Sequence, residues 1–145
     1  FYGGEIGEMI VNSVNKSGGL LTLKDLQNYK SVWRDPVKFK YKDLEIISMS
    51  LPSSGGILLG QMLKVIENYD IKSFGYNSLK TIQLLVEAER RAYADRSHFM
   101  GDPDYMNLPV YELMDKEYVV DRMRNFSWDK ATSSSDVKHG NIILN

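Results

Sequence analysis

Two stretches near the middle of the chain, VKFKYKDLEIIS at residues 37–48 and LPSSGGILLGQMLKVI at residues 51–66, decide the fold. The first alternates apolar residues with lysines from Val37 to Tyr41, which is the period of a β-strand with one face in water. A second apolar run follows the pair Lys42-Asp43, so this stretch predicts a β-hairpin. The second stretch is a loop that leads into apolar residues at helical spacing. Together they predict an α/β chain of the α+β type, with helices beside a hairpin.

Upstream of the hairpin, helical periodicity predicts an amphipathic helix over residues 5–16. The glycines that follow it supply a left-handed cap. A short helix over about residues 26–29 comes next, and Thr22 and Asp25 stand before it at the spacing of a capping box.

Downstream of residue 66, the pattern predicts a long helix over residues 79–100 and a last helix over residues 115–125. The sequence contains no segment with the character of a linker. We therefore expect residues 1–145 to form a single domain, made mainly of helices plus the hairpin. The apolar stripe expected to bury the long helix consists of Ile82, Leu85, Val86, Ala92, Tyr93 and Phe99.

Composition narrows the class of protein. The 145 residues match the size of one domain, and the 43% apolar and 26% charged residues are typical of a packed core under a solvated surface. Lysine and arginine number 18 against 19 aspartate and glutamate, and this balance argues against nucleic-acid binding. The absence of cysteine excludes disulfide scaffolds, thiolate zinc sites and cysteine nucleophiles in this chain.

The ends of the chain also carry information. No apolar run approaches the roughly 20 residues that a membrane-spanning helix requires, so we expect no span in this chain. The first residue is Phe1 rather than methionine, and the final residues are apolar. We therefore expect both ends to be cut or processed.

The turn Ser53-Ser54-Gly55-Gly56 between hairpin and helix allows two interpretations. Its glycines let backbone N–H groups converge at a helix N-terminus, where an anion binds favourably. Alternatively, Ser54, or Ser53, caps the helix, and the glycines permit a close approach of the backbone. The turn matches neither the Gly-x-Ser-x-Gly nucleophile elbow nor the end of a P-loop.

Charged residues gather at the end of the long helix. Asp95 and Arg96 precede the segment that holds Asp102 and Asp104. A divalent cation could bind these acids, but acids at a helix C-terminus oppose the helix dipole and call for a counter-charge. We therefore expect Arg96, Asp102 and Asp104 to form a structural cluster in which Arg96 pairs with one of the acids.

His98 and His139 are the only histidines. A serine triad would need His98 to reach a serine and an aspartate, whereas a histidine on a polar helix face is the simpler interpretation. Two histidines without clustered partners make a poor metal site, so we predict neither a metal nor a cofactor. Glu87 and Arg91 form an i,i+4 pair of favourable polarity, which we expect on a solvated or inter-helix face.

Several separated motifs occur in a characteristic order. They are FYGGEI at 1–6, GGLLT at 18–22, DLQNY at 25–29, LPSSGG at 51–56, EAER at 87–90, AYADRS at 92–97 and GDPD at 101–104. This order resembles γ-glutamyltranspeptidase, in the C-terminal part of its large subunit. The resemblance spans nearly the whole chain and weakens after about Tyr111.

The resemblance implies a fragment of the four-layer αββα fold of the N-terminal nucleophile hydrolases. In that family a precursor cleaves itself, and the new N-terminal threonine of the small subunit becomes the nucleophile, with its own α-amino group as the base. The γ-glutamyl group of glutathione or a related amide passes to that threonine and then to water or an acceptor amino acid or peptide. Bacterial members are typically periplasmic or secreted, and animal members lie on the cell surface.

The resemblance also places the chemistry outside this chain. The large subunit would end near Asn145, the nucleophile and the oxyanion segment would follow it, and the arginine that holds the substrate would precede Phe1. We therefore assign no catalytic residue here, because Thr22 and Thr132 match nothing catalytic. The resemblance implies that the turn at residues 53–56 lies against the small subunit, next to the substrate pocket.

Two other classes of function remain open on the residues alone. One is a binding or interaction module related to the family, which uses the turn at 53–56 to hold a carboxylate. The other is a structural fragment without a ligand, whose helices pack on an absent partner. In either case the unpaired hairpin, with Val37, Phe39, Ile46 and Ile47, favours self-association of the isolated chain.

Overall fold

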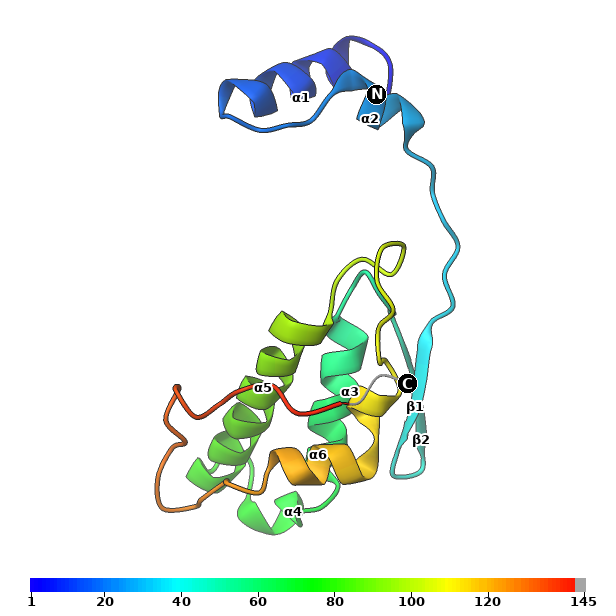
Figure 1. Ribbon diagram of the computed structural model, residues 1–145. Coiled ribbons are helices and arrows are strands. Elements are labelled where there is room, and N and C mark those ends of the chain that lie inside the picture. The colour runs from blue at the N-terminus through cyan, green and yellow to red at the C-terminus, as the bar shows by residue number, and fades with distance from the viewer. Residues whose placement is uncertain (143–145) are drawn as a thin grey trace. The chain divides into compact units, whose positions relative to one another are not determined.

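A computed structural model describes residues 1–142 of the chain. The chain divides into two compact units, Phe1–Arg34 and Asp35–Asn145 (Figure 1). The sequence pattern, which predicted a single domain, did not mark this division. Over the described residues, none of the helices combines the length and apolar character that crossing a bilayer requires.

The first unit is a pair of helices. Helix α1 covers Glu5–Lys16 and helix α2 covers Leu23–Asn28. The predicted capping box is confirmed, because the Asp25 N–H donates to Thr22 Oγ1 (3.2 Å) and the Thr22 N–H donates to the Asp25 carboxylate (2.8 Å). Gly18 takes a positive φ of 81° in the connection, as the predicted left-handed cap requires.

The second unit opens with the predicted hairpin. Strand β1 (Val37–Tyr41) pairs antiparallel with strand β2 (Leu44–Ser48), with Val37 opposite Ser48 and Tyr41 opposite Leu44. The two-residue turn places Lys42 at a φ of 53°, as a tight hairpin turn demands. One face of the hairpin packs inward through Val37, while Ile47 on the other face stays exposed.

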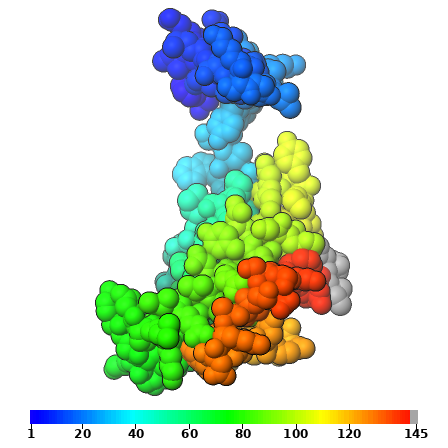
Figure 2. Space-filling view, turned by 90° about the vertical axis from the view of Figure 1, so that its left-hand side faces the viewer, coloured from blue at the N-terminus to red at the C-terminus, as the bar shows by residue number. Residues whose placement is uncertain are grey.

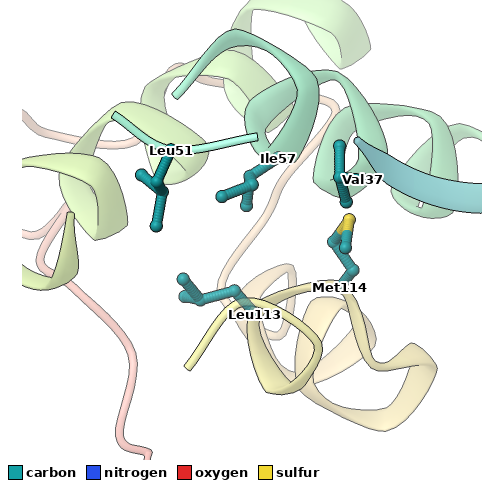
Figure 3. Close-up of a cluster of buried hydrophobic side chains, with 5 residues drawn as sticks. All are labelled: Val37, Leu51, Ile57, Leu113 and Met114. Carbon is teal, nitrogen blue, oxygen red and sulfur yellow. The ribbon is translucent and has the colours of Figure 1, made fainter. Parts of the chain in front are cut away.

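Helix α3 (Gly55–Ile66) follows the turn and packs beside the hairpin, with its start next to the buried Val37. The short 3-10 helix η1 (Glu112–Met114) closes the same core from the opposite side. Figure 3 shows the side chains from these elements meeting in one cluster. The cluster consists of Val37, Leu51, Ile57, Leu113 and Met114.

The long helix α5 (Leu79–Phe99) lies beside α3, and α6 (Lys116–Arg122) crosses them (Figure 1). The short α4 (Ile71–Phe74) precedes α5. Ser78 caps α5 through a bond from the Thr81 N–H to its hydroxyl (3.2 Å). A second apolar cluster joins these helices and consists of Val65, Leu84, Ala88, Val119 and Met123.

The face that α5 buries differs from the predicted stripe. Ile82, Val86 and Tyr93 are about half exposed, and they lie on the side opposite the core. The buried residues of α5 are Leu84, Glu87, Ala88, Arg91, Ala92 and Asp95. Of the predicted stripe, Ala92 is buried and Phe99 packs against the first cluster, so the prediction holds there and fails at Ile82, Val86 and Tyr93. It fails because three of the six buried residues carry charge, which a count of apolar residues does not detect.

After α6 the chain runs without regular structure through residue 142. Figures 1 and 2 show this tail, coloured orange to red, passing back along α5. The helix-rich unit with a two-stranded antiparallel hairpin confirms the predicted fold class.

Candidate functional site

The turn before α3 is built differently from the predicted side-chain cap. Ser54 precedes the helix, and its carbonyl accepts the N–H groups of Ile57 (3.1 Å) and Leu58 (3.0 Å), but its side chain caps no N–H. Instead, Arg96 Nε donates to Ser54 Oγ at 2.9 Å. The prediction of a Ser54 side-chain cap is therefore wrong, because Arg96 from α5 engages the hydroxyl.

The two glycines of this turn stand in unlike surroundings. A Cβ on Gly56 would collide with the Met49 carbonyl and lie 2.7 Å from Val37 Cγ1, so only glycine lets α3 approach the hairpin. A Cβ on Gly55 would meet only Ser53 Oγ, at 3.8 Å. The predicted close approach of the backbone is confirmed at Gly56 and is absent at Gly55.

A small polar hollow of about 250 Å³ lies between this turn and the end of α5. Arg96 and Ser54 meet at it. No ion pair joins Arg96 to Asp102 in the part of the chain that the structure describes; Asp102 instead accepts the backbone N–H of Asp104 (3.0 Å). The Asp102 half of the predicted pairing is therefore wrong, because Arg96 turns toward the serine. The hollow is lined by Pro52, Ser54, Arg96, Ser97, Met100 and Gly101.

His98 lies away from any serine triad. Its ring stacks on the ring of His139, with centroids 3.5 Å apart and planes at 4°. Phe99 meets both rings edge-on. Within residues 1–142, no three His, Asp or Glu side chains gather as a metal site would need.

The most developed polar structure is a line of three buried charges on α5, which we call the ionic spine: Glu87, Arg91 and Asp95. Each is at most 3% exposed, and a spacing of four residues puts all three on one face of the helix. Burying a charge is unfavourable unless it is paired and hydrogen-bonded. All three charges of the ionic spine are paired and hydrogen-bonded.

At one end of the spine, Glu87 and Arg91 form a close ion pair (2.5 Å). Arg91 also donates to the carbonyl of Arg122 (2.7 Å), to Asn125 Oδ1 (2.8 Å) and to Thr132 Oγ1 (3.1 Å). The predicted i,i+4 pair is therefore confirmed, and it faces neighbouring segments rather than solvent.

The same contacts set the pKa of Glu87. Burial is the largest influence and raises this pKa, but hydrogen bonds from Arg91 and Thr132 and the charge of Arg91 together outweigh it. They lower the pKa of Glu87 from its ordinary 4.5 to about 2. The carboxylate is thus fixed in its charged form near neutral pH.

At the other end, Asp95 is fully buried and accepts four donors. Gln61 Nε2 reaches it from α3 (2.8 Å), and Arg122 from α6 pairs with both of its oxygens (3.2 and 3.1 Å). The backbone N–H of Gly140 supplies the last bond (2.8 Å). Burial, and then the neighbouring Asp95 carboxylate, raise the pKa of Tyr118.

Sequence reasoning found the Glu87–Arg91 pair but missed Gln61, Asp95 and Arg122 as one network. The available signal was the repeat of charged residues every four positions on α5, which alternates in sign. Both spine carboxylates are saturated by cations and N–H groups. This arrangement suits them to hold segments together rather than to exchange protons with a substrate.

The chain is similar to known proteins over nearly its whole length. Residues 1–143 match the family model described as Gamma-glutamyltranspeptidase. The chain is 41% identical over 142 residues to a glutathione hydrolase proenzyme of Escherichia coli, covering 98% of this chain and 24% of the relative. It is 37% identical over 132 residues to the acylase ACY 1 proenzyme of a Pseudomonas strain, covering 91% of this chain and 24% of the relative.

A solved structure agrees with these relatives. The crystal structure of Helicobacter pylori gamma-glutamyltranspeptidase superimposes with a TM-score of 0.82 at 44% identity, covering 97% of this chain and 40% of that one. The chain thus spans about a quarter of the length of the curated relatives that it matches. Fold, motif order and identity agree, and the chain belongs to the gamma-glutamyltranspeptidase family.

Proposed function

We propose that this chain is the C-terminal part of the large subunit of a γ-glutamyltranspeptidase. The complete protein transfers the γ-glutamyl group of glutathione or a related amide to water or to an acceptor amino acid or peptide. The observation that carries this proposal is the likeness to a glutathione hydrolase proenzyme over 98% of the chain.

The chemistry belongs to residues outside this chain. An N-terminal threonine, released when the precursor is cut, attacks the γ-glutamyl carbonyl and forms an acyl-enzyme, with its α-amino group as the base. The small subunit that carries this threonine is the partner of the chain. The saturated carboxylates of the ionic spine support a structural task for this part.

Within the chain, the turn at Ser53, Ser54, Gly55 and Gly56 is our candidate for the part next to the substrate pocket. The exposed Arg96 guanidinium stands beside it, and the start of α3 points into the same region. Both carry positive character, which favours a carboxylate-bearing substrate. If the protein is bacterial, we place the enzyme in the periplasm or outside the cell.

The acylase likeness favours a second candidate, an amide hydrolase whose acyl group is not γ-glutamyl. Both candidates use the same N-terminal nucleophile, so they differ in the donor rather than in the mechanism. The donor assay below separates them.

The test compares the complete protein with residues 1–145 alone, using a γ-glutamyl anilide and an acyl anilide without the α-amino acid group. We expect the complete protein to appear as two chains and to release the aniline from the γ-glutamyl donor. We expect residues 1–145 to release none, because no nucleophile is present. Turnover by residues 1–145 would contradict the assignment of chemistry to the small subunit, and preference for the other donor would select the acylase.

A further inference from the structure

Three successive residues of the irregular tail, Lys138, His139 and Gly140, are each held by a different group. The Lys138 carbonyl accepts Arg122 Nη2 (2.5 Å). The His139 ring stacks on His98 of α5. The Gly140 N–H donates to Asp95 Oδ1 (2.8 Å). We call these three residues the tail anchor.

The tail anchor is tightly packed at its last residue, Gly140. A Cβ on Gly140 would collide with the Tyr118 hydroxyl and lie 2.7 Å from Arg122 Cδ. Any side chain there would force Tyr118 or Arg122 to move, whereas the φ of Gly140 is not the positive one that favours glycine. The tail cannot shift at Gly140 without breaking the bond to Asp95.

The groups that hold the anchor are themselves rigid. Asp95 is fully buried, and Gln61 and Arg122 orient its carboxylate from two further helices. A buried ion pair is a weak source of stability compared with apolar packing, since desolvation offsets most of the attraction. What the pair supplies here is a fixed position for Gly140, because a charge and directed hydrogen bonds set its place more narrowly than the apolar packing of Ile142 on the first cluster does.

We propose that Asp95 and Arg122 are positioning residues for self-cleavage of the precursor, because they fix the tail anchor, and in the proposed large subunit the cleaved bond lies on the C-terminal side of this tail. This inference rests on the proposed function. In self-cleavage the threonine hydroxyl attacks the preceding carbonyl carbon, the C–N bond breaks, and the released amine takes the proton. Water then hydrolyses the ester to a carboxylate and a free hydroxyl. Asp95 exchanges no proton in these steps; it holds the chain at Gly140, on the N-terminal side of the attacked bond.

Loss of this positioning should slow self-cleavage measurably. Displacing reacting atoms by about 1 Å can slow a step about 100-fold. We expect Asp95→Asn and Gly140→Ala, each made in the full-length precursor, to slow self-cleavage about 10- to 100-fold. The Gly140 variant leaves the buried carboxylate intact, so it tests the anchor even if Asp95→Asn fails to fold. Ser135→Ala, whose hydroxyl bonds only within the exposed part of the tail, is the matched control.

Two lysines of the tail report the state of the anchor directly. Lys138 lies inside it and Lys130 lies outside, so trypsin cutting after each can be followed by mass spectrometry on the same molecule. We expect both variants to speed cutting after Lys138 about tenfold or more, since proteolysis follows local opening. Cutting after Lys130, and both rates in Ser135→Ala, should stay unchanged.

The pH–rate profile of self-cleavage separates positioning from proton transfer. In the variants we expect its height to fall at every pH and its shape to persist, whereas loss of one limb would make Asp95 an acid or base and overturn the proposal. Faster trypsin cutting after Lys138 in a variant that still cleaves itself at the parent rate would also overturn the proposal. A parent precursor that never cleaves itself would refute the proposed function instead, and the trypsin rates would still decide whether the anchor forms.

Discussion

At the scale of single residues, Glu87 makes the stability of the second unit depend on pH. Its pKa is about 2 when folded and 4.5 as an ordinary glutamate, so the folded state holds the charged form more strongly. The contribution is complete above about pH 4.5 and is lost as the pH falls through about 2, below which both states are protonated. It amounts to about 3 kcal/mol.

We therefore expect urea unfolding to show a stability that falls between about pH 4.5 and pH 2. Glu87→Gln should remove most of this pH dependence and lower stability at pH 7 by about 3 kcal/mol, because Arg91 loses its charged partner. The matched control is Glu89→Gln, on the exposed part of the same helix. Equal pH profiles for the parent and Glu87→Gln would contradict the ion pair.

The hydrogen bond between Arg96 and Ser54 is exposed, and this exposure limits how much it contributes to stability. Because Arg96 binds a hydroxyl in an exposed position rather than a buried acid, we expect Arg96→Ala to lower the free energy of unfolding by less than about 1 kcal/mol. Ser54→Ala should have an equally small effect, since its side chain caps no N–H. Thermal melts of both single variants and the double variant test this. A loss of about 2 kcal/mol would favour the predicted serine cap if it occurs in Ser54→Ala, and the predicted structural cluster of Arg96 with an acid if it occurs in Arg96→Ala.

At the scale of elements, the glycines that start α3 are a matched pair. Gly56 has no room for a methyl group against Met49 and Val37, whereas Gly55 has ordinary space. We expect Gly56→Ala to destabilise the unit by about 1–3 kcal/mol through overpacking. Gly55→Ala should be neutral or stabilising by up to about 1 kcal/mol, because alanine favours the helix. Chemical denaturation of the two variants side by side gives the comparison, and an equal change in stability for the two would contradict the difference in space between Gly55 and Gly56.

Elements with local causes could be predicted from the sequence. The capping box at Thr22 and Asp25, the Ser78 cap and the Lys42-Asp43 turn each depend on residues within a few positions of one another. The face of α5 could not be predicted, because it depends on distant partners. Gln61, Arg122 and Gly140 make burial of Asp95 favourable, and they lie 27 to 45 positions away in the sequence. For the same reason the sequence assigned Arg96 to nearby acids, whereas Ser54, 42 positions away, binds it.

At the scale of the whole molecule, an apolar stripe runs along α5 on the side opposite the ionic spine. It consists of Leu79, Ile82, Val86 and Tyr93, each at least 45% exposed. Residues at this spacing share one face of the helix. Exposed apolar side chains gathered on one helix face mark an interface or favour association.

We expect the isolated 145-residue chain to self-associate through this stripe, because no described residue of the second unit covers it. Light scattering over a range of concentrations should show mass increasing for the parent chain. The double variant Ile82→Lys/Val86→Lys should reduce that increase, since charge on the stripe opposes its burial. Asp129→Lys changes the net charge by the same amount at an exposed site in the tail and serves as the control. A parent chain that stays monomeric, or a control that disperses it as well as the double variant, would show that the stripe drives no association.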